Sequence, residues 1–453
     1  MKKHTKRIAC FLAFLLLVSM LAGCQQTPGG SPSSAAGESS ASGEPVEEQV
    51  LEIAVFEGGY GRAYWDAAAK AFEEANPGVT VNITANPEIG EIIRPNILSG
   101  NAPDFIYLAS NNASGVATAL IKDKALADLT DVMEEVKDKI LPGFLETSNC
   151  QPYGDGKIYL APMYYSSMGL WYNKTFFEEN NLEPATTWEE FFALGDKAKE
   201  LGRALFTYQG LVPAYLESLV TPAIATSAGL EGMEKCAAYE EGAWKNEGIR
   251  QVLENIARIG SDGYLMDGTV ALDHTQSQSE WLAGKALFIP CGSWIEGEMA
   301  DAPREKGFEY GFCAPPVLNA EADKYVFSSI EEMYIPAAAK NVELAKKFLI
   351  FQYSDEMIQL NAELAKGVPP VVGAADYLKE YVSDAVYESY MVYEEGYKPV
   401  IGQPFGVVAD TEISPKDEFY NQVGDVLMGK ETVDQWIEKT EEVSTSVRDK
   451  LIK

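Results

Sequence analysis

Short apolar runs alternate with amphipathic segments along the first part of the chain. Three apolar runs are short enough for buried strands, and the first two are each followed by a segment with helical spacing of its apolar residues. Gly, Pro and Asn residues separate the segments, as is typical of turns. The predicted strands are residues 51–56, 79–84 and 103–108, and the predicted helices are residues 62–75 and 87–98. This β-α-β-α-β order predicts a parallel sheet with right-handed crossovers.

The pattern becomes mixed in the rest of the chain. Capping boxes at residues 187–190 and 432–435 each predict the start of a helix. Residues 153–172 are less regular, and we interpret them as a segment that crosses between two lobes. Residues 325–336 predict paired strands that cross back. The other predicted elements are strands at 203–207 and 308–313 and helices at 212–227, 246–261 and 342–353.

One stretch combines a strand end, a helix start and a large aromatic residue. The apolar run 286–290 predicts a buried strand, Cys291-Gly292 predicts a turn, and Ser293 is suited to cap a helix that begins with Trp294. Open α/β sheets place their ligands where strands end and helices begin. An indole there suits a neutral polar ligand with an apolar face, such as a sugar. The alternative is that Trp294 packs in the core.

Chain length indicates the number of domains, and net charge limits the classes of partner that we expect. The 453 residues suggest two domains, and the formal net charge is −32. A negative field of this size repels phosphates, so we expect no nucleic acid partner. The same field argues weakly against anionic ligands.

The amino terminus predicts export and anchoring. Residues 1–23 combine a basic start with a short apolar run, which is typical of a secretory signal peptide rather than a membrane span. The ending Leu21-Ala22-Gly23-Cys24 resembles a bacterial lipobox, in which Cys24 receives the lipid. Residues 24–49 then form a Ser-, Gly-, Ala-, Pro- and Glu-rich segment that predicts a disordered tether.

Few residues are suited to catalysis or metal binding. The chain has two histidines, and His274, the one outside the predicted signal, cannot supply a metal cluster alone. No Gly-x-Ser-x-Gly or phosphate-loop motif is present. A glycosidase needs only two carboxylates, so counting leaves that alternative open. Glu331 and Glu332 would point to opposite sides of a strand and form a poor acid–base pair. The pairing of Cys150, Cys236, Cys291 and Cys313 stays open.

Planar polar and aromatic residues recur at the predicted strand ends. They can form paired hydrogen bonds to adjacent hydroxyl groups and stack on a sugar ring. Each residue alone is explained by loop structure or packing, but their recurrence at four strand ends favours a carbohydrate cleft. The residues are Glu57, Tyr60, Asn111, Asn112, Tyr208, Gln209 and Trp294.

The chain resembles the extracellular solute-binding lipoproteins of bacterial ABC sugar importers, which have the maltose-binding type of fold. The motifs that carry this resemblance are APDFIYL, KIYLAPMYYSSMGLWYNKTFF, TTWEEFFAL, WLAGKALFIPCGSW and VELAKKFLIFQYS. The resemblance implies an α/β fold of two lobes, each a sheet flanked by helices, with a ligand cleft between them. It implies an amino-terminal lobe of residues 50–163 and 317–375 and a carboxyl-terminal lobe of residues 164–316 and 376–453.

The resemblance also assigns functional positions. It places a stacking role on Trp294 and contact loops at residues 57–61, at residues 110–112 and at Tyr208-Gln209. Tyr164, Tyr165 and Glu331 fall at the crossings between the lobes. The sequence departs from many sugar binders after the third strand, where Asn111-Asn112 replaces Asp or Arg.

The function implied is binding without catalysis and without a cofactor or metal. The protein would be a monomer, lipid-anchored on the outer face of the bacterial cell membrane, and would pass a sugar to an ABC permease. The motifs AVFEGGYGRAYWDA, GAWKNEGI and GYLMDGTVALDHTQSQSEWLAGKALFIPCGSWIEGEM resemble the subgroup that binds N-acetylglucosamine and N,N'-diacetylchitobiose. A different sugar and an anchored glycosidase are the alternatives.

Replacing Cys24 with serine tests the predicted anchor. We expect Cys24→Ser to release the protein or to leave it unprocessed, because the lipid on Cys24 is the predicted anchor. Cell fractionation with immunoblotting measures this, and Cys150→Ser serves as a control that leaves the lipobox intact. A processed, unlipidated mutant that stays on the membrane would contradict the lipoprotein prediction.

Overall fold

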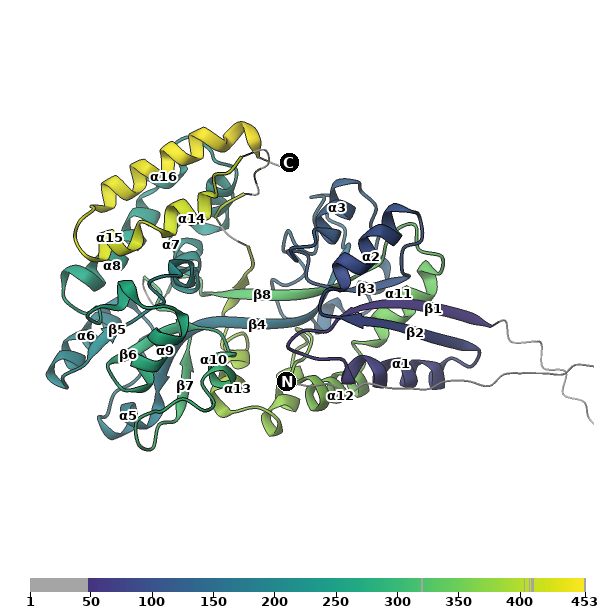
Figure 1. Cartoon of the computed structure of the whole chain (residues 1–453), viewed down its shortest axis with the longest axis horizontal. Helices are drawn as coiled ribbons and strands as arrows, with labels where there is room; N and C mark the ends of the chain where they lie inside the picture. The colour runs from purple at the N-terminus through teal and green to yellow at the C-terminus, as the bar shows by residue number, and fades with distance from the viewer. Residues whose placement is uncertain (1–47, 319–320, 403, 407, 409–410, 452–453) are drawn as a thin grey trace, which may run out of the picture. The chain divides into compact units, whose positions relative to one another are not determined.

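The three amino-terminal strands form the predicted parallel sheet. Strand β1 (Gln49–Phe56) pairs in parallel with β2 (Val79–Asn86) on one edge and with β3 (Phe105–Tyr107) on the other. The computed structural model describes residues 48–318, 321–402, 404–406, 408 and 411–451 (Figure 1). The predicted signal peptide and Cys24 lie outside these residues, as does nearly all of the predicted tether.

Helices cover both faces of this sheet because successive strand residues point to opposite sides. Leu51, Ile53 and Val55 pack in one core with side chains of helix α1 (Ala63–Ala75). Ala54 packs in another core with Ile89 and Ile93 of helix α2 (Ile89–Leu98). Figure 1 shows α1 and α2 on opposite sides of β1.

Two long strands connect this sheet to a second one. Strand β4 (Leu160–Asn173) pairs antiparallel with β8 (Tyr325–Tyr334), and the two run side by side in Figure 1. The carboxyl half of β4 also pairs with β6 (Ala286–Cys291) and β7 (Tyr310–Cys313). On its other edge, β8 pairs with β3 and with β9 (Lys398–Val400). The strand order is β2-β1-β3-β8-β4-β6-β5, where β5 is Ala204–Phe206.

The crossing segments are more regular than the sequence predicted. The paired strands predicted at 325–336 are wrong, because β8 is one continuous strand whose partners come from distant parts of the chain. No glycine or proline interrupts residues 325–334, so the chain has no turn there. The segment predicted as irregular at 153–172 contains most of β4, which is buried along nearly its whole length.

The remaining helices surround the two sheets. Their bounds are α3 Val116–Lys122, α4 Thr130–Met133, α5 Lys174–Glu179, α6 Trp188–Glu200, α7 Glu217–Ala237, α8 Glu247–Ser261, α9 His274–Leu282, α10 Ile295–Glu298, α11 Val342–Phe351, α12 Asp355–Ala365, α13 Asp384–Met391, α14 Pro415–Tyr420, α15 Val423–Leu427 and α16 Val433–Val447. A separate core joins α6, α7, α8 and α16 to β5 and β6.

The helix-start predictions are confirmed at two positions and wrong at one. Thr187 and Thr432 form complete capping boxes before α6 and α16. Ser293 does not cap α10, because the turn continues for one more residue and Trp294 takes the cap position without a side-chain hydrogen bond. The helix predicted at 212–227 begins as a short 3₁₀ turn at Pro213–Leu216 and continues as α7 (Glu217–Ala237), whose helical backbone is interrupted at Gly229 (φ 73°, ψ 169°), two residues after the predicted end.

The four cysteines left unassigned by the sequence, Cys150, Cys236, Cys291 and Cys313, are free thiols in the structure. Within the described residues, no helix combines the length and apolar character needed to cross a membrane.

A buried carboxylate fixes the loop that follows β3. Glu332 of β8 is fully buried, and its Oε2 accepts a hydrogen bond from the Ser110 backbone N–H at 2.8 Å. Its Oε1 accepts from the Ser110 hydroxyl at 2.8 Å and from the Asn149 amide at 3.1 Å. Burial raises the pKa of Glu332 to about 7, although these hydrogen bonds favour the ionised form and oppose the shift.

Replacing Glu332 with glutamine should change how stability depends on pH. The ordinary pKa of this carboxyl is 4.5 and the folded value is about 7. Between these values the unfolded chain loses the proton first, so the free energy of unfolding falls as pH rises. In Glu332→Gln we expect this fall to be smaller by about 2–4 kcal/mol, since one pKa unit corresponds to about 1.4 kcal/mol.

Chemical denaturation at several pH values between 4.5 and 7 measures the effect. Glu88→Gln is the control, because Glu88 is exposed and its variant should keep the full wild-type fall. An unchanged pH dependence in Glu332→Gln would contradict the assignment of the raised pKa to this carboxyl.

Candidate ligand-binding site

Three predicted site residues come together beside the long strands. Tyr60, in the loop after β1, stacks on Tyr164 of β4 with ring centroids 3.8 Å apart and an interplanar angle of 12°. Glu331 of β8 is the register partner of Tyr164. Gly367 makes this contact possible, because a Cβ there would lie 2.5 Å from Tyr60 and 2.8 Å from Tyr164.

Hydrogen bonds extend this aromatic group. The Tyr107 hydroxyl donates to Glu331 Oε2, and the Tyr164 hydroxyl donates to Asn361 Oδ1 at 2.7 Å. Burial raises the pKa of Glu331, and the bond from Tyr107 opposes this shift. Burial also raises the pKa of Tyr60, which lies near both Tyr390 and Glu331. The group is therefore made of neutral aromatic hydroxyls around one carboxyl.

A second group surrounds Trp294. Its indole is 36 % exposed and packs directly over Gly292, where a Cβ would lie 2.1 Å from the ring. Tyr215 lies beside it in the 3₁₀ turn before α7. Burial raises the pKa of Tyr215 to about 12, and a hydrogen bond with the Trp294 side chain opposes the shift. Trp294 thus presents part of an aromatic face to solvent from a fixed position.

Polar residues from α9 and α10 complete the group around Trp294. His274 Nε2 lies 2.7 Å from Glu298 Oε2, and the Gln278 amide donates to the same oxygen at 2.9 Å. The His274 ring packs on Tyr215 with centroids 4.8 Å apart. The Gln278 amide also lies 3.7 Å from Cys291 Sγ, one residue before Gly292. Two helices and a strand end are therefore joined around the indole.

The predicted contact loop after β5 is buried. Tyr208 and Gln209 are both fully buried, and the Gln209 amide donates to the Pro290 carbonyl oxygen at 3.0 Å, close to Trp294 in the sequence. Within the described residues, neither Gln209 Oε1 nor the Tyr208 hydroxyl has a hydrogen-bond partner. Gln209 therefore joins the Trp294 group, while Tyr208 packs in the core with Phe206.

The predicted asparagines lie in the loop held by Glu332. Asn111 is exposed, and Asn112 is half-buried with its Oδ1 accepting from the Ser114 backbone N–H at 3.0 Å. This bond gives Asn112 a role in the turn, whereas Asn111 is presented to solvent. Their predicted contact with a ligand stays a prediction.

The last two predicted residues are Tyr165 and Glu57, and Tyr165 contacts Tyr390, which also lies near Tyr60. Tyr165 is buried among Phe144, Tyr390 and Tyr393, on the side of β4 opposite Tyr164. Glu57 is half-buried directly after β1, and its backbone N–H donates to the Asn86 carbonyl oxygen.

Most of the polar residues around Trp294 were not predicted from the sequence. His274 and Gln278 are four residues apart on one helix, and this spacing places them on one face. That spacing could have indicated a polar helix face. The cluster itself also requires Glu298, which belongs to a separate helix. No sequence pattern indicated the partners of the aromatic group around Tyr164, because each lies in an ordinary helix or strand. These partners are Tyr107, Tyr390 and Asn361.

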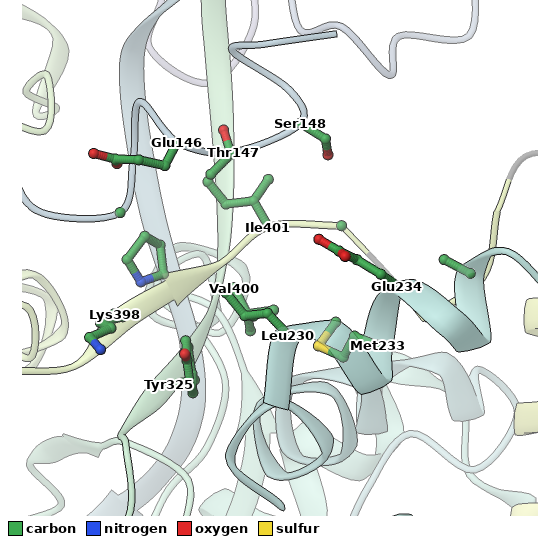
Figure 2. A pocket seen from close by; sticks show the side chains of 14 residues that line it. Glu146, Thr147, Ser148, Leu230, Met233, Glu234, Tyr325, Lys398, Val400 and Ile401 are labelled. Atoms are coloured by element: carbon green, nitrogen blue, oxygen red, sulfur yellow. The ribbon is translucent and has the colours of Figure 1, made fainter. Parts of the chain in front are cut away.

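A cavity of about 290 Å³ lies elsewhere and contains none of the predicted residues. Figure 2 shows Val400 and Ile401 between Thr147 and two residues of α7, Leu230 and Met233. Its walls combine aliphatic side chains with the charged groups of Glu146, Glu234 and Lys398, and its one aromatic residue, Tyr325, is buried. A sugar ring needs an accessible aromatic face, so the Trp294 group is the better candidate.

The chemistry of the candidate site is that of recognition. It combines an accessible aromatic face with planar amides, hydroxyls and carboxylates suited to hydrogen bonding. Among the described residues, no three His, Cys, Asp or Glu side chains form a group that could hold a metal ion.

Solved structures with similar folds are solute-binding proteins. The apo form of RafE from Streptococcus pneumoniae aligns with a TM-score of 0.73 and 18 % identity, covering 89 % of this chain and 98 % of that one. A chitin oligosaccharide binding protein aligns with a TM-score of 0.58 and 19 % identity, covering 88 % and 99 %. The two-lobed α/β fold expected from the sequence is confirmed by these neighbours.

Sequence relatives agree with the fold. The diacetylchitobiose binding protein NgcE of Streptomyces coelicolor is 26 % identical over 337 residues, which cover 71 % of each chain. The multiple sugar-binding protein of Streptococcus mutans is 23 % identical over 295 residues, which cover 64 % of this chain and 68 % of the relative. Residues 67–388 match the family described as bacterial extracellular solute-binding protein. The chain therefore belongs to this family of binding proteins and is not an enzyme.

Proposed function

We propose that this protein captures a carbohydrate outside the cell and delivers it to the permease of an ABC importer. The ligand class that we favour is N-acetylglucosamine or a chitobiose-type oligosaccharide. The observation that carries this proposal is the fixed, partly exposed indole of Trp294 with planar polar groups at its edge. An aromatic face of this kind stacks on the C–H face of a pyranose, and the polar groups bond its hydroxyls.

The relatives support the ligand class. NgcE is named for diacetylchitobiose, and one structural neighbour is named for chitin oligosaccharides. Another neighbour, RafE, has been solved with raffinose, so a different sugar is the alternative. Diacetylchitobiose presents both ring faces for stacking and amide groups for hydrogen bonding, which matches the composition of the Trp294 group.

We further propose that ligand binding closes two lobes around a hinge. The lobes would be residues 50–163 with 317–375 and residues 164–316 with 376–453. The long strands β4 and β8 cross between these proposed lobes, and Tyr164 and Glu331 lie opposite each other in their register. A ligand that contacts both lobes favours the closed form by the contacts that only this form provides. A lipid on Cys24 would hold the monomer near its permease.

Replacing Trp294 with alanine tests the proposed stacking. Aromatic stacking contributes about 0.5–1.5 kcal/mol beyond area burial, and the lost apolar contact contributes about 2–3 kcal/mol more. We therefore expect Trp294→Ala to weaken diacetylchitobiose binding by about a hundredfold to a thousandfold, since 1.4 kcal/mol corresponds to tenfold. Titration calorimetry on the purified variant, with folding checked by circular dichroism, measures this change.

Tyr377→Ala is a matched control, because Tyr377 is 39 % exposed and lies outside the candidate site. It removes a ring of similar exposure and should leave the affinity unchanged. A folded Trp294→Ala protein with wild-type affinity would exclude the stacking role. Failure of the wild-type protein to bind any saccharide in a broad panel would overturn the proposed function.

A further inference from the structure

We propose that the Trp294 group also accepts amino sugars that carry a free ammonium group at C2. This inference rests on the proposed function, because it assumes that a sugar ring lies on the Trp294 indole. It adds a class of ligand, partly or fully deacetylated chito-oligosaccharides, to the neutral saccharides considered above.

The first step is an excess of hydrogen-bond acceptors. Gln278 is fully buried, and its amide nitrogen is occupied by Glu298 and Cys291. Within the described part of the chain, neither Gln278 Oε1 nor His274 Nδ1 has a partner. Gln278 Oε1 is an acceptor, whereas the role of His274 Nδ1 depends on the tautomer, because His274 Nε2 lies 2.7 Å from Glu298 Oε2 and 3.0 Å from Gln278 Nε2. An unpaired buried acceptor is costly, so Gln278 Oε1 favours a ligand that brings hydrogen-bond donors to this group.

The second step is their position beside the aromatic face. Glu298 lies one helical turn after Trp294, and its backbone N–H donates to the Trp294 carbonyl oxygen at 2.9 Å. His274 packs on Tyr215, which lies beside the Trp294 side chain. A substituent of a sugar that stacks on Trp294 therefore points toward the side chains of His274, Gln278 and Glu298. These three side chains form a polar wall beside the indole.

The third step is the charge of this wall. Glu298 is 40 % exposed, and within the described residues its ion-pair partner is His274 rather than a lysine or arginine. Two basic residues of neighbouring segments, Lys416 and Arg304, contact other groups instead of Glu298. Lys416 pairs with Glu217, and Arg304 donates to the carbonyl oxygens of Met299 and Ala300. Among the described residues, the Glu298 carboxylate is therefore a negative charge that no lysine or arginine pairs with.

An ammonium group matches both the unpaired hydrogen-bond acceptor and the negative charge of this group. It carries one positive charge and three N–H donors, whereas a hydroxyl offers one donor and an acetamido group one N–H. Hydrogen bonds between charged partners are about twice as strong as neutral ones. A divalent metal ion is a poorer match, because hard cations prefer several carboxylate or carbonyl oxygens and this group holds one carboxylate.

Three disaccharides with the same β-1,4-linked backbone test the inference. Cellobiose, diacetylchitobiose and the glucosamine disaccharide differ at C2, where they carry hydroxyl, acetamido and ammonium groups. By calorimetry at neutral pH and low salt, we expect the glucosamine disaccharide to bind about tenfold more tightly than cellobiose, as a charge-assisted contact would provide. High salt should reduce this preference, because Glu298 is partly exposed to solvent.

Glu298→Gln should abolish the preference for the glucosamine disaccharide over cellobiose, so the readout is the ratio of the two affinities within each variant. Glu280→Gln is the matched control, since Glu280 lies on α9 and pairs with Lys285 instead. If Glu298→Gln does not fold, the wild-type comparison and its salt dependence still decide the question.

The outcomes separate this inference from the proposed function. If the wild-type protein binds diacetylchitobiose but binds the glucosamine disaccharide no more tightly than cellobiose, the inference is overturned and the function stands. An equal loss of all three ligands in Glu298→Gln would also overturn it, because the cluster would then only position Trp294. If no saccharide binds, the proposed function itself fails.

Discussion

Backbone pairing between β4 and β8 is the interaction on which the rest of the structure depends. The register runs from Leu160 opposite Tyr334 to Met168 opposite Phe327, with an irregularity between Pro162 and Tyr164. Because each strand also pairs with other strands at its ends, this ladder joins both sheets. It also brings Tyr164 and Glu331 together from positions far apart in the sequence. A slip of one residue would turn both side chains to the opposite face.

Strand geometry also explains why two adjacent glutamates are tolerated in the core. Glu331 and Glu332 point to opposite sides of β8, so each carboxyl finds its own donors. Burying either one unpaired would be costly. Tyr107 compensates on one side, and Ser110 with Asn149 compensates on the other. Both partnerships fix the end of β3, where the candidate ligand loop begins.

The sequence predicts local elements well and distant partnerships poorly. The parallel β1–β2–β3 unit and the capping boxes at Thr187 and Thr432 were predictable, because spacing and capping act within a few residues. The single strand β8 was not, because its regularity comes largely from β3 and β4, which lie more than a hundred residues away in the sequence. At the candidate site, Trp294 was predictable because it is an aromatic residue at the end of a predicted strand. Its neighbours His274 and Glu298 became a cluster only through tertiary contact, which no local pattern encodes.

The bare backbone at Gly292 has a consequence for how this binding surface can change over evolution. The indole of Trp294 rests where a side chain at position 292 would otherwise stand, 2.1 Å from a Cβ placed there. A mutation of this glycine would tilt the ring while leaving the tryptophan itself and its polar neighbours intact. In the proposed binding mode, new ligand preferences could therefore arise from a buried residue beneath the ring. Comparisons of recognition residues alone would not detect such a change.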